Sequence, residues 1–136
     1  MAAIDAAMVS KILNATTSIT AFSTLTTGKK VKLNSTLSTA STPGAELTGG
    51  TGYTTGGAAI AFTTSAAGSS VTGPTGSAIS WTNGSGGNWT IESFDLTDSA
   101  GTPIRTWWGP FTGQPITVAN NNVFQLSVNA ISIGLT

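Results

Sequence analysis

The sequence predicts a mostly β fold, an antiparallel β-sandwich of the jelly-roll or Ig-like kind with about eight short strands and a short N-terminal α-helix. Two observations predict the sheets. After residue 28, apolar residues alternate with polar ones in short runs, and turn-forming residues separate these runs. A third observation predicts the helix, because the first fourteen residues carry apolar side chains at helical spacing. The length suits a single domain, 1–136, made of a helix at 1–14 and a β-sandwich at 29–136.

The predicted helix has one apolar stripe. Ile4, Met8 and Ile12 recur at every fourth position, which places them on one face of a helix. Asp5 lies near the positive end of the helix dipole, and the β-branched residues after Asn14 disfavour continuation. A helix this short is marginal by itself in water. Its stripe must therefore dock either on the chain's own sheet or on a neighbouring subunit.

The first predicted strands flank a glycine-rich segment. Val31 and Leu33 alternate with polar residues beside the one basic cluster, which we interpret as a solvated strand start. A glycine-rich loop follows from 42 to 57, and then a strand around Ile60 and Phe62. The loop lacks the lysine and the following helix that a phosphate-binding loop requires. We therefore interpret it as a surface loop.

The remaining predicted strands follow at short intervals. Between residues 89 and 96 the alternation slips by one position, and a bulge near Glu92 and Ser93 would explain the slip. Pro110 and Pro115 end a tryptophan-containing strand. The apolar positions that predict these strands are Ile79 and Trp81; Trp89, Ile91, Phe94 and Leu96; Ile104 with Trp107 or Trp108; Val118; Phe124, Leu126 and Val128; and Ile131, Ile133 and Leu135.

The composition argues against most kinds of catalytic and metal-binding site. The chain has no His, no Cys, and only five acidic and five basic residues. Common nucleophilic, acid–base and metal sites need clusters of these residue types. We therefore expect no enzyme activity and no cofactor. The zero net charge does not suit a nucleic-acid partner, and no apolar run is long enough to span a membrane.

Two pairs of acidic residues are the remaining candidates for chemistry. Glu92 and Asp95 could act as paired carboxylates in glycosidic cleavage, but their separation places them on opposite faces of a regular strand. Asp95 and Asp98 could bind a cation, yet the segment lacks the full ligand pattern of an EF-hand loop. Capping of a turn by the Asp98 side chain is the interpretation we favour.

Aromatic residues are the best candidates for recognition of a partner. The adjacent Trp107 and Trp108 must point to opposite faces of a strand. One can fill the core, while the other faces a partner subunit, lies under a loop or forms a platform that stacks on carbohydrate. Together with the helix stripe and the one tyrosine, they make up the predicted interface. Its residues are Ile4, Met8, Ile12, Tyr53, Trp107 and Trp108.

Several segments occur in a recognisable order along the chain. KILNATTSITAF leads to VKLNSTLSTASTPG, and Glu46-Leu47-Thr48-Gly49-Gly50 follows with Tyr53 shortly after. WTIESFDLTDSAGTPIRTWWGP then precedes ITVANNNVFQLSVNAISIGLT. In this order the chain resembles a family of small virion proteins of tailed bacteriophages, described as head-decoration, minor tail or tail-fibre proteins. It departs from the family at Thr54-Thr55, where Ala-Arg is frequent, and at an Asn-Asn that replaces the usual Gly-Asp.

The resemblance implies a structural component of the virion, made in the cytoplasm of the bacterial host. We expect a capsid decoration (cement) protein that stabilises the head by binding capsomers. Its partners would be the major capsid protein and copies of itself, and neither a nucleic acid nor a membrane is expected as a partner. The alternative is a tail-tip or tail-fibre module that recognises a host surface, with tail proteins or a host glycan as partners.

Overall fold

The computed structural model describes residues 3–16, 28–48, 50–63 and 70–134. The fold is mostly β, with antiparallel sheets in a sandwich-like arrangement and one short helix, as the sequence predicts. The described part of the chain contains eleven strands. The sequence did not predict the first and fourth of them, and it joined the sixth and seventh into one. The start of the predicted helix, at Met1 and Ala2, and Leu135 lie outside the described residues.

All elements of the described residues are short. Helix α1 spans Ala6–Thr16. The strands are β1 (Ala3–Ile4), β2 (Lys29–Asn34), β3 (Ala58–Ile60), β4 (Val71–Gly73), β5 (Ile79–Thr82), β6 (Trp89–Ile91), β7 (Ser93–Asp98), β8 (Arg105–Pro110), β9 (Ile116–Val118), β10 (Val123–Leu126) and β11 (Ile131–Ile133).

One layer is a five-stranded antiparallel sheet with the order β1-β8-β7-β2-β3. β7 lies at its centre and pairs with β2 over the full length of both strands. Val31 lies opposite Leu96, and Leu33 opposite Phe94, so these four side chains share the face that packs on the core. Because side chains alternate along a strand, their neighbours face the other side of the sheet.

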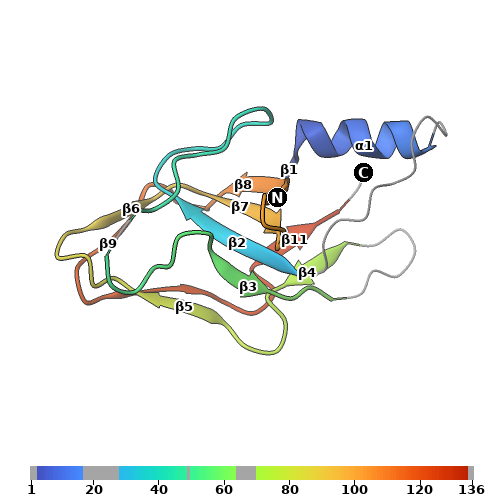
Figure 1. The fold of residues 1–136 in the computed structure, drawn as a ribbon. Helices are drawn as coiled ribbons and strands as arrows, with labels where there is room; N and C mark the ends of the chain where they lie inside the picture. The colour runs from blue at the N-terminus through green and yellow to red at the C-terminus, as the bar shows by residue number, and fades with distance from the viewer. Residues whose placement is uncertain (1–2, 17–27, 49, 64–69, 135–136) are drawn as a thin grey trace.

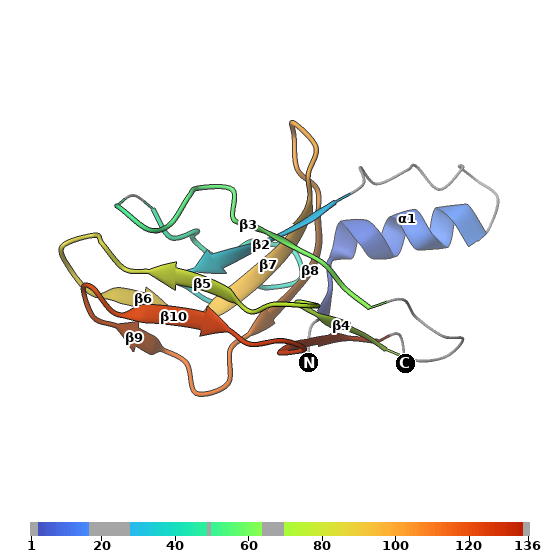
Figure 2. The same ribbon diagram turned by 90° about the horizontal axis from the view of Figure 1, so that it is seen from below.

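The second layer consists of three strand pairs, β5–β10, β6–β9 and β4–β11. In Figure 1 β5 lies below the five-stranded sheet and β6 and β9 lie at its left end, and Figure 2 shows the pairs β5–β10 and β6–β9 at the same end of the molecule. Phe111 connects the two layers. Its ring centroid lies 5.3 Å from that of Phe94 in the large sheet and 5.3 Å from that of Phe124 in β10. The layers therefore share one hydrophobic core.

The chain passes from one layer to the other at Glu92, between β6 and β7. The Glu92 N–H donates to the carbonyl of Asn34, and the Glu92 carbonyl accepts from the N–H of Phe111. Ile91 and Phe94 are both buried in the core on either side of this crossing. The slip in the sequence pattern thus marks a change of sheet. The bulge predicted near Glu92 and Ser93 is wrong, because the irregular pairing of β7 with β8 lies between Leu96 and Thr97.

The helix begins later than the sequence predicts. Ile4 lies in β1 and pairs with Trp107, and the Asp5 N–H continues this pairing by donating to the carbonyl of Thr106. The helix therefore starts at Ala6 and ends at Thr16, in place of the predicted 1–14. Ladder hydrogen bonds to β8 outweigh the helical spacing at Ile4, because they satisfy backbone groups that a frayed first turn would leave to water. No described helix has the length and apolar character needed to cross a membrane.

The glycine-rich segment packs on the large sheet. Leu47 is buried, and its N–H donates to the carbonyl of Leu33, so this part covers the edge of β2. Gly57 has a φ of +79°, and a Cβ there would lie 2.2 Å from the carbonyl oxygen of Val31. Glycine is required at this close approach. Lys32 in the basic cluster is paired with Glu46 at 3.2 Å. The segment is thus a largely exposed loop, as we expected, which Leu47 and Tyr53 anchor in the folded body.

Candidate assembly interface

The N-terminal arm, which we define as Ala3–Thr16, contacts the sheet through a short stretch. Its strand β1 is the edge of the large sheet, with Ala3 opposite Trp108 and Ile4 opposite Trp107. The carbonyl of Asp5 then accepts the first helical hydrogen bonds, from the N–H groups of Met8 and Val9. Asp5 is thus the residue at which the strand becomes a helix.

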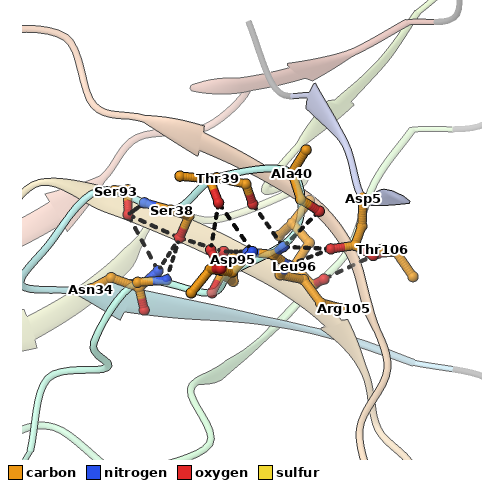
Figure 3. Close-up of polar contacts among 12 residues, drawn as sticks. Asp5, Asn34, Ser38, Thr39, Ala40, Ser93, Asp95, Leu96, Arg105 and Thr106 are labelled. Carbon is orange, nitrogen blue, oxygen red and sulfur yellow. Dashed lines mark hydrogen bonds and ion pairs between the residues drawn. The ribbon is translucent and has the colours of Figure 1, made fainter. Parts of the chain in front are cut away.

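A buried ion pair fixes this joint. Arg105 Nε donates to Asp5 Oδ2 at 2.6 Å, and Arg105 Nη1 lies 3.4 Å from Asp95 Oδ1. Arg105 Nη2 also donates to the carbonyls of Thr39, at 2.7 Å, and Ala40, at 3.1 Å. Figure 3 shows the guanidinium between the arm, the central strand and the 39–40 loop. One side chain therefore connects three segments that are far apart in the sequence.

Further polar contacts continue from Asp95 along the outer face of the sheet. Ser38 Oγ donates to Asp95 Oδ1 at 2.8 Å and lies 3.2 Å from Ser93 Oγ. Asn34 Nδ2 donates to both serine hydroxyls, at 3.0 Å and 3.3 Å. All four residues are buried. Buried polar groups that bond one another hold a surface in one geometry, so this network is a rigid base for the arm (Figure 3).

Five of the six predicted interface residues gather around the arm. Ile4 and Trp107 form a cross-strand pair, Met8 is buried, and Ile12 is half-buried. The predicted stripe of Ile4, Met8 and Ile12 is wrong as a single helix face, because Ile4 belongs to the strand. Met8 and Ile12 still lie on the partly covered side of α1, and α1 contacts β8. The N-terminal end of α1 thus packs on the sheet of its own chain.

The two adjacent tryptophans lie on opposite faces of β8. Trp107 pairs with Leu96 and packs against the hydrophobic core, whereas Trp108 pairs with Asp95 on the outer face. Both side chains are half-buried. The Nε1 atom of Trp108 is buried without a hydrogen-bond partner among the described residues. The alternation predicted for the pair is confirmed, but neither ring is an open platform.

Tyr53 lies apart from the other predicted interface residues. Its side chain is only 6% exposed and meets Trp89 edge to face, with ring centroids 6.3 Å apart. Its hydroxyl accepts from the N–H of Leu33 and donates to Glu46 Oε1. Burial raises the pKa of the Tyr53 hydroxyl, and the hydrogen bond to Glu46 raises it further, although the Leu33 N–H opposes them. Tyr53 is thus a core residue that completes the edge of β2.

Beyond Met8 the helix turns apolar side chains outward. Val9 is 38% exposed and Leu13 is 57% exposed. In Figures 1 and 2, α1 runs past the strands, away from the end of the molecule formed by β6 and β9. Exposed apolar side chains are ordinary when scattered, but two of them one turn apart on a projecting helix form a compact contact surface.

The sequence did not predict that Asp5, Arg105 and Asp95 would form ion pairs with one another. Arg105 is the only arginine of the chain, and it binds two of the three aspartates, Asp5 and Asp95. Asp5 was interpreted only as a helix-dipole residue, and Asp95 only as a candidate for catalysis or cation binding. In a chain with so few charges, a lone arginine in a strand of otherwise apolar and small residues was a usable signal. A guanidinium is rarely buried without carboxylate partners.

The other acidic candidates have structural positions. Asp98 is buried, and its Oδ1 accepts from the N–H of Ile104, which confirms the predicted closure of the 98–104 turn. Asp95 is committed to Arg105 and Ser38. Among the residues that the structure describes, no three acidic side chains gather closely enough to hold a metal ion.

A crevice of about 380 Å³ opens between the two layers near Phe111. Its walls include Phe94 and Phe124 from the core, and Gln125 and Ser127 from β10 and the residue after it. It lies apart from the arm, and none of the predicted interface residues lines it.

No protein-family model matches the chain, and no curated protein matches it significantly.

Proposed function

We propose that this chain is a structural protein of a tailed-phage virion and serves as a capsid decoration protein that binds capsomers. The observation that carries the proposal is the projecting arm. A buried ion pair between Asp5 and Arg105 fixes its start, and Val9 and Leu13 face outward beyond it. The order of sequence segments, which resembles small virion proteins, supports the same class.

The arm suits binding that is repeated on a lattice. Complete burial of a valine or leucine side chain contributes about 1.5–3 kcal/mol, and Val9 and Leu13 are already partly covered. A single arm therefore gives weak binding. Weak contacts become effective when many copies bind a symmetric surface and support one another. A decoration protein meets this condition, since capsomers repeat over the head.

The tryptophans do not favour the glycan-binding alternative. Trp81 and Trp89 are buried in the core, and Trp107 and Trp108 are half-buried in the sheet that carries the arm. Stacking on a sugar needs an open ring face. We therefore favour decoration of the head over a tail-tip or tail-fibre role, and the location of the chain in the virion distinguishes the two.

The first test is the copy number of the chain in purified virions, measured by quantitative mass spectrometry on separated heads and tails. Decoration of the head predicts hundreds of copies with the head fraction. A small number of copies confined to tails would overturn the proposal and favour host-surface recognition. Binding on a glycan array by the assembled protein would then distinguish a receptor-binding module from a tail structural protein.

A second test uses capsids assembled without this chain. The double variant Val9→Ser with Leu13→Ser should bind such capsids at least tenfold more weakly than the unchanged protein. The matched control is Val123→Ser with Val128→Ser, since these side chains are 56% and 44% exposed and lie away from the arm. Equal binding by both double variants would show that the arm is not the contact surface.

A further inference from the structure

We infer that the edge of β8 is a docking site for the N-terminal arm of a second copy of this chain, so that neighbouring copies join by exchanging arms. This inference deepens the proposed function by naming the partner of the arm. Its test uses purified protein alone, so its failure is distinguishable from failure of the capsid-binding proposal.

The docking contacts are specific and confined to a short stretch of the arm. They consist of the pairing of Ala3 and Ile4 with β8, the Asp5 N–H to the carbonyl of Thr106, and the Ala6 N–H to the carbonyl of Ala40. The Asp5 carboxylate adds the ion pair with Arg105. Every group that receives the arm lies on β8 or the 39–40 loop, so each copy carries the complete receptor as well as the arm.

The receptor stays organised when its own arm leaves. Arg105 keeps Asp95 Oδ1 and the carbonyls of Thr39 and Ala40. Ser38 and Asn34 continue to hold the outer face of the sheet. An edge strand with open N–H and C=O groups and a preformed cation is a template for another chain's strand.

The connection between arm and body permits exchange. Residues 17–28 join α1 to β2, and twelve residues reach at most about 40 Å when extended. The arm itself contributes a helix of eleven residues, which is about 16 Å long. An adjacent copy therefore lies within reach. Zero net charge adds no general repulsion between copies.

Concentration decides between the two arrangements. A short connection holds an arm near its own receptor at an effective concentration of about 1 mM. Dilute protein should therefore keep its arm, whereas copies held side by side at similar local concentrations should exchange. Exchange replaces each contact by an identical one, so no new surface is needed.

The test uses the absence of cysteine in the natural sequence. The double variant Ala3→Cys with Trp108→Cys places two thiols at directly opposed positions of β1 and β8. The protein labelled with ¹⁵N and the unlabelled protein are unfolded, mixed in equal amounts, refolded at low or high concentration and oxidised. Trypsin then releases peptides 1–11 and 106–136, since Lys11 and Arg105 are the cleavage sites.

Mass spectrometry of the linked peptides reads the origin of each partner. Links within one chain join two heavy or two light peptides, whereas exchange also joins heavy to light. We expect mixed links to be rare at about 1 μM and to approach roughly half of all links above about 1 mM. Mixed links that stay at the control level at every concentration would overturn the inference.

Two further variants keep the result interpretable. Ile4→Cys with Trp107→Cys tests the neighbouring pair, because adjacent antiparallel pairs alternate between wide and narrow spacing. Ser80→Cys with Gln125→Cys is the matched control, since these exposed residues oppose each other within the body and should give links within one chain only. Failure of both arm variants to form any link, while the control links, would show that β1 does not dock on β8 and would also overturn the inference.

Discussion

Asp5 and Arg105 are one hundred positions apart in the chain, and Arg105 Nε donates to Asp5 Oδ2 at 2.6 Å in a buried ion pair. The pair joins the first residues of the arm to the edge of the large sheet. Because Asp95 shares the same guanidinium, two carboxylates depend on one cation. Replacement of Arg105 and replacement of Asp5 should therefore differ in their effect on stability.

Removal of the cation should cost more stability than removal of one carboxylate. Arg105→Met removes the guanidinium that pairs with both Asp5 and Asp95, and should lower the free energy of unfolding by about 3–5 kcal/mol. Asp5→Asn keeps the size of the side chain and leaves Arg105 paired with Asp95, and should cost about 1–2 kcal/mol. Urea unfolding measures both values.

The control for this comparison is Lys30→Met, which removes a cation from β2 that forms no ion pair in the described part of the chain. It should change the free energy of unfolding by less than about 1 kcal/mol. If Asp5→Asn costs as much as Arg105→Met, the guanidinium does not serve both carboxylates.

Alkaline pH should unfold the protein through Tyr53. The pKa of its hydroxyl is raised from 10.0 in the folded chain, first by burial and then by Glu46. A raised pKa means that the folded state keeps its proton longer than the unfolded state, so stability is full below pH 10.0 and falls above it. Tyr53 is the only tyrosine, and its tyrosinate absorbance should therefore appear together with the loss of the β-sheet circular dichroism.

Titration of Lys29 changes the stability of the fold in the opposite direction to that of Tyr53, and at lower pH. Burial lowers the pKa of its ammonium below 10.5, although Asp98 opposes this effect. The unfolded state binds the proton more readily, so stability rises as the pH approaches 10.5 from below.

The control for the Tyr53 prediction is Tyr53→Phe. In this variant the loss of stability at alkaline pH should disappear, at a cost of about 1–3 kcal/mol at neutral pH, because the Leu33 N–H loses its acceptor. Tyrosinate absorbance that precedes unfolding would contradict this prediction.

The sequence Asn83-Gly84 should resist deamidation in the folded protein. Asn83 is fully buried, and its amide donates to the carbonyls of Gly87 and Val118 and accepts from Ser85. The reaction requires the Gly84 nitrogen to attack the Asn83 side chain with loss of ammonia, but the Gly84 N–H is held by the carbonyl of Thr51.

We expect deamidation at Asn83 to be about tenfold or more slower in the folded chain than in urea, because each hydrogen bond that must break adds about 1 kcal/mol or more to the barrier. Mass spectrometry of timed samples measures the rate. Ser85→Ala removes one hydroxyl donor to Asn83 and should raise it. Equal rates in folded and unfolded protein would contradict the protection.

Gly52 should be far less replaceable than Gly86. Both have positive φ angles, +107° and +83°, so alanine is strained at either position. A Cβ on Gly52 would lie 1.6 Å from the carbonyl oxygen of Thr82, whereas nothing lies within 4 Å of one on Gly86. Gly86→Ala should cost about 1–2 kcal/mol, and Gly52→Ala about 4 kcal/mol or more. Similar urea midpoints for the two variants would contradict the close approach.

Much of the sheet structure could be predicted because most strands bury apolar side chains on one face only. Val31 with Leu33, Trp89 with Ile91, Phe124 with Leu126, and Ile131 with Ile133 alternate in the sequence and are buried in the structure. Alternation fixes which residues face the core. It carries no information on which strands pair, and so the order β1-β8-β7-β2-β3 did not follow from it.

The arm and its base could not be predicted in the same way. Ile4 fits a helical spacing, yet hydrogen bonds from β8, which begins more than one hundred residues later, place it in a strand. Tyr53 is in a glycine-rich segment and looks exposed, but its hydroxyl supplies an acceptor that the edge of β2 lacks. Both outcomes depend on long-range partners, and local patterns do not record these partners.

The crossing at Glu92 has a mechanical consequence. A single residue joins β6 to β7, and hydrogen bonds from its N–H and to its carbonyl connect it to Asn34 and Phe111. The two layers are therefore linked by the covalent backbone in the middle of the molecule, with almost no slack between them. A shearing load on one layer passes directly to the other through the main chain, so the body should deform as one stiff plate while the arm alone adjusts to its surroundings.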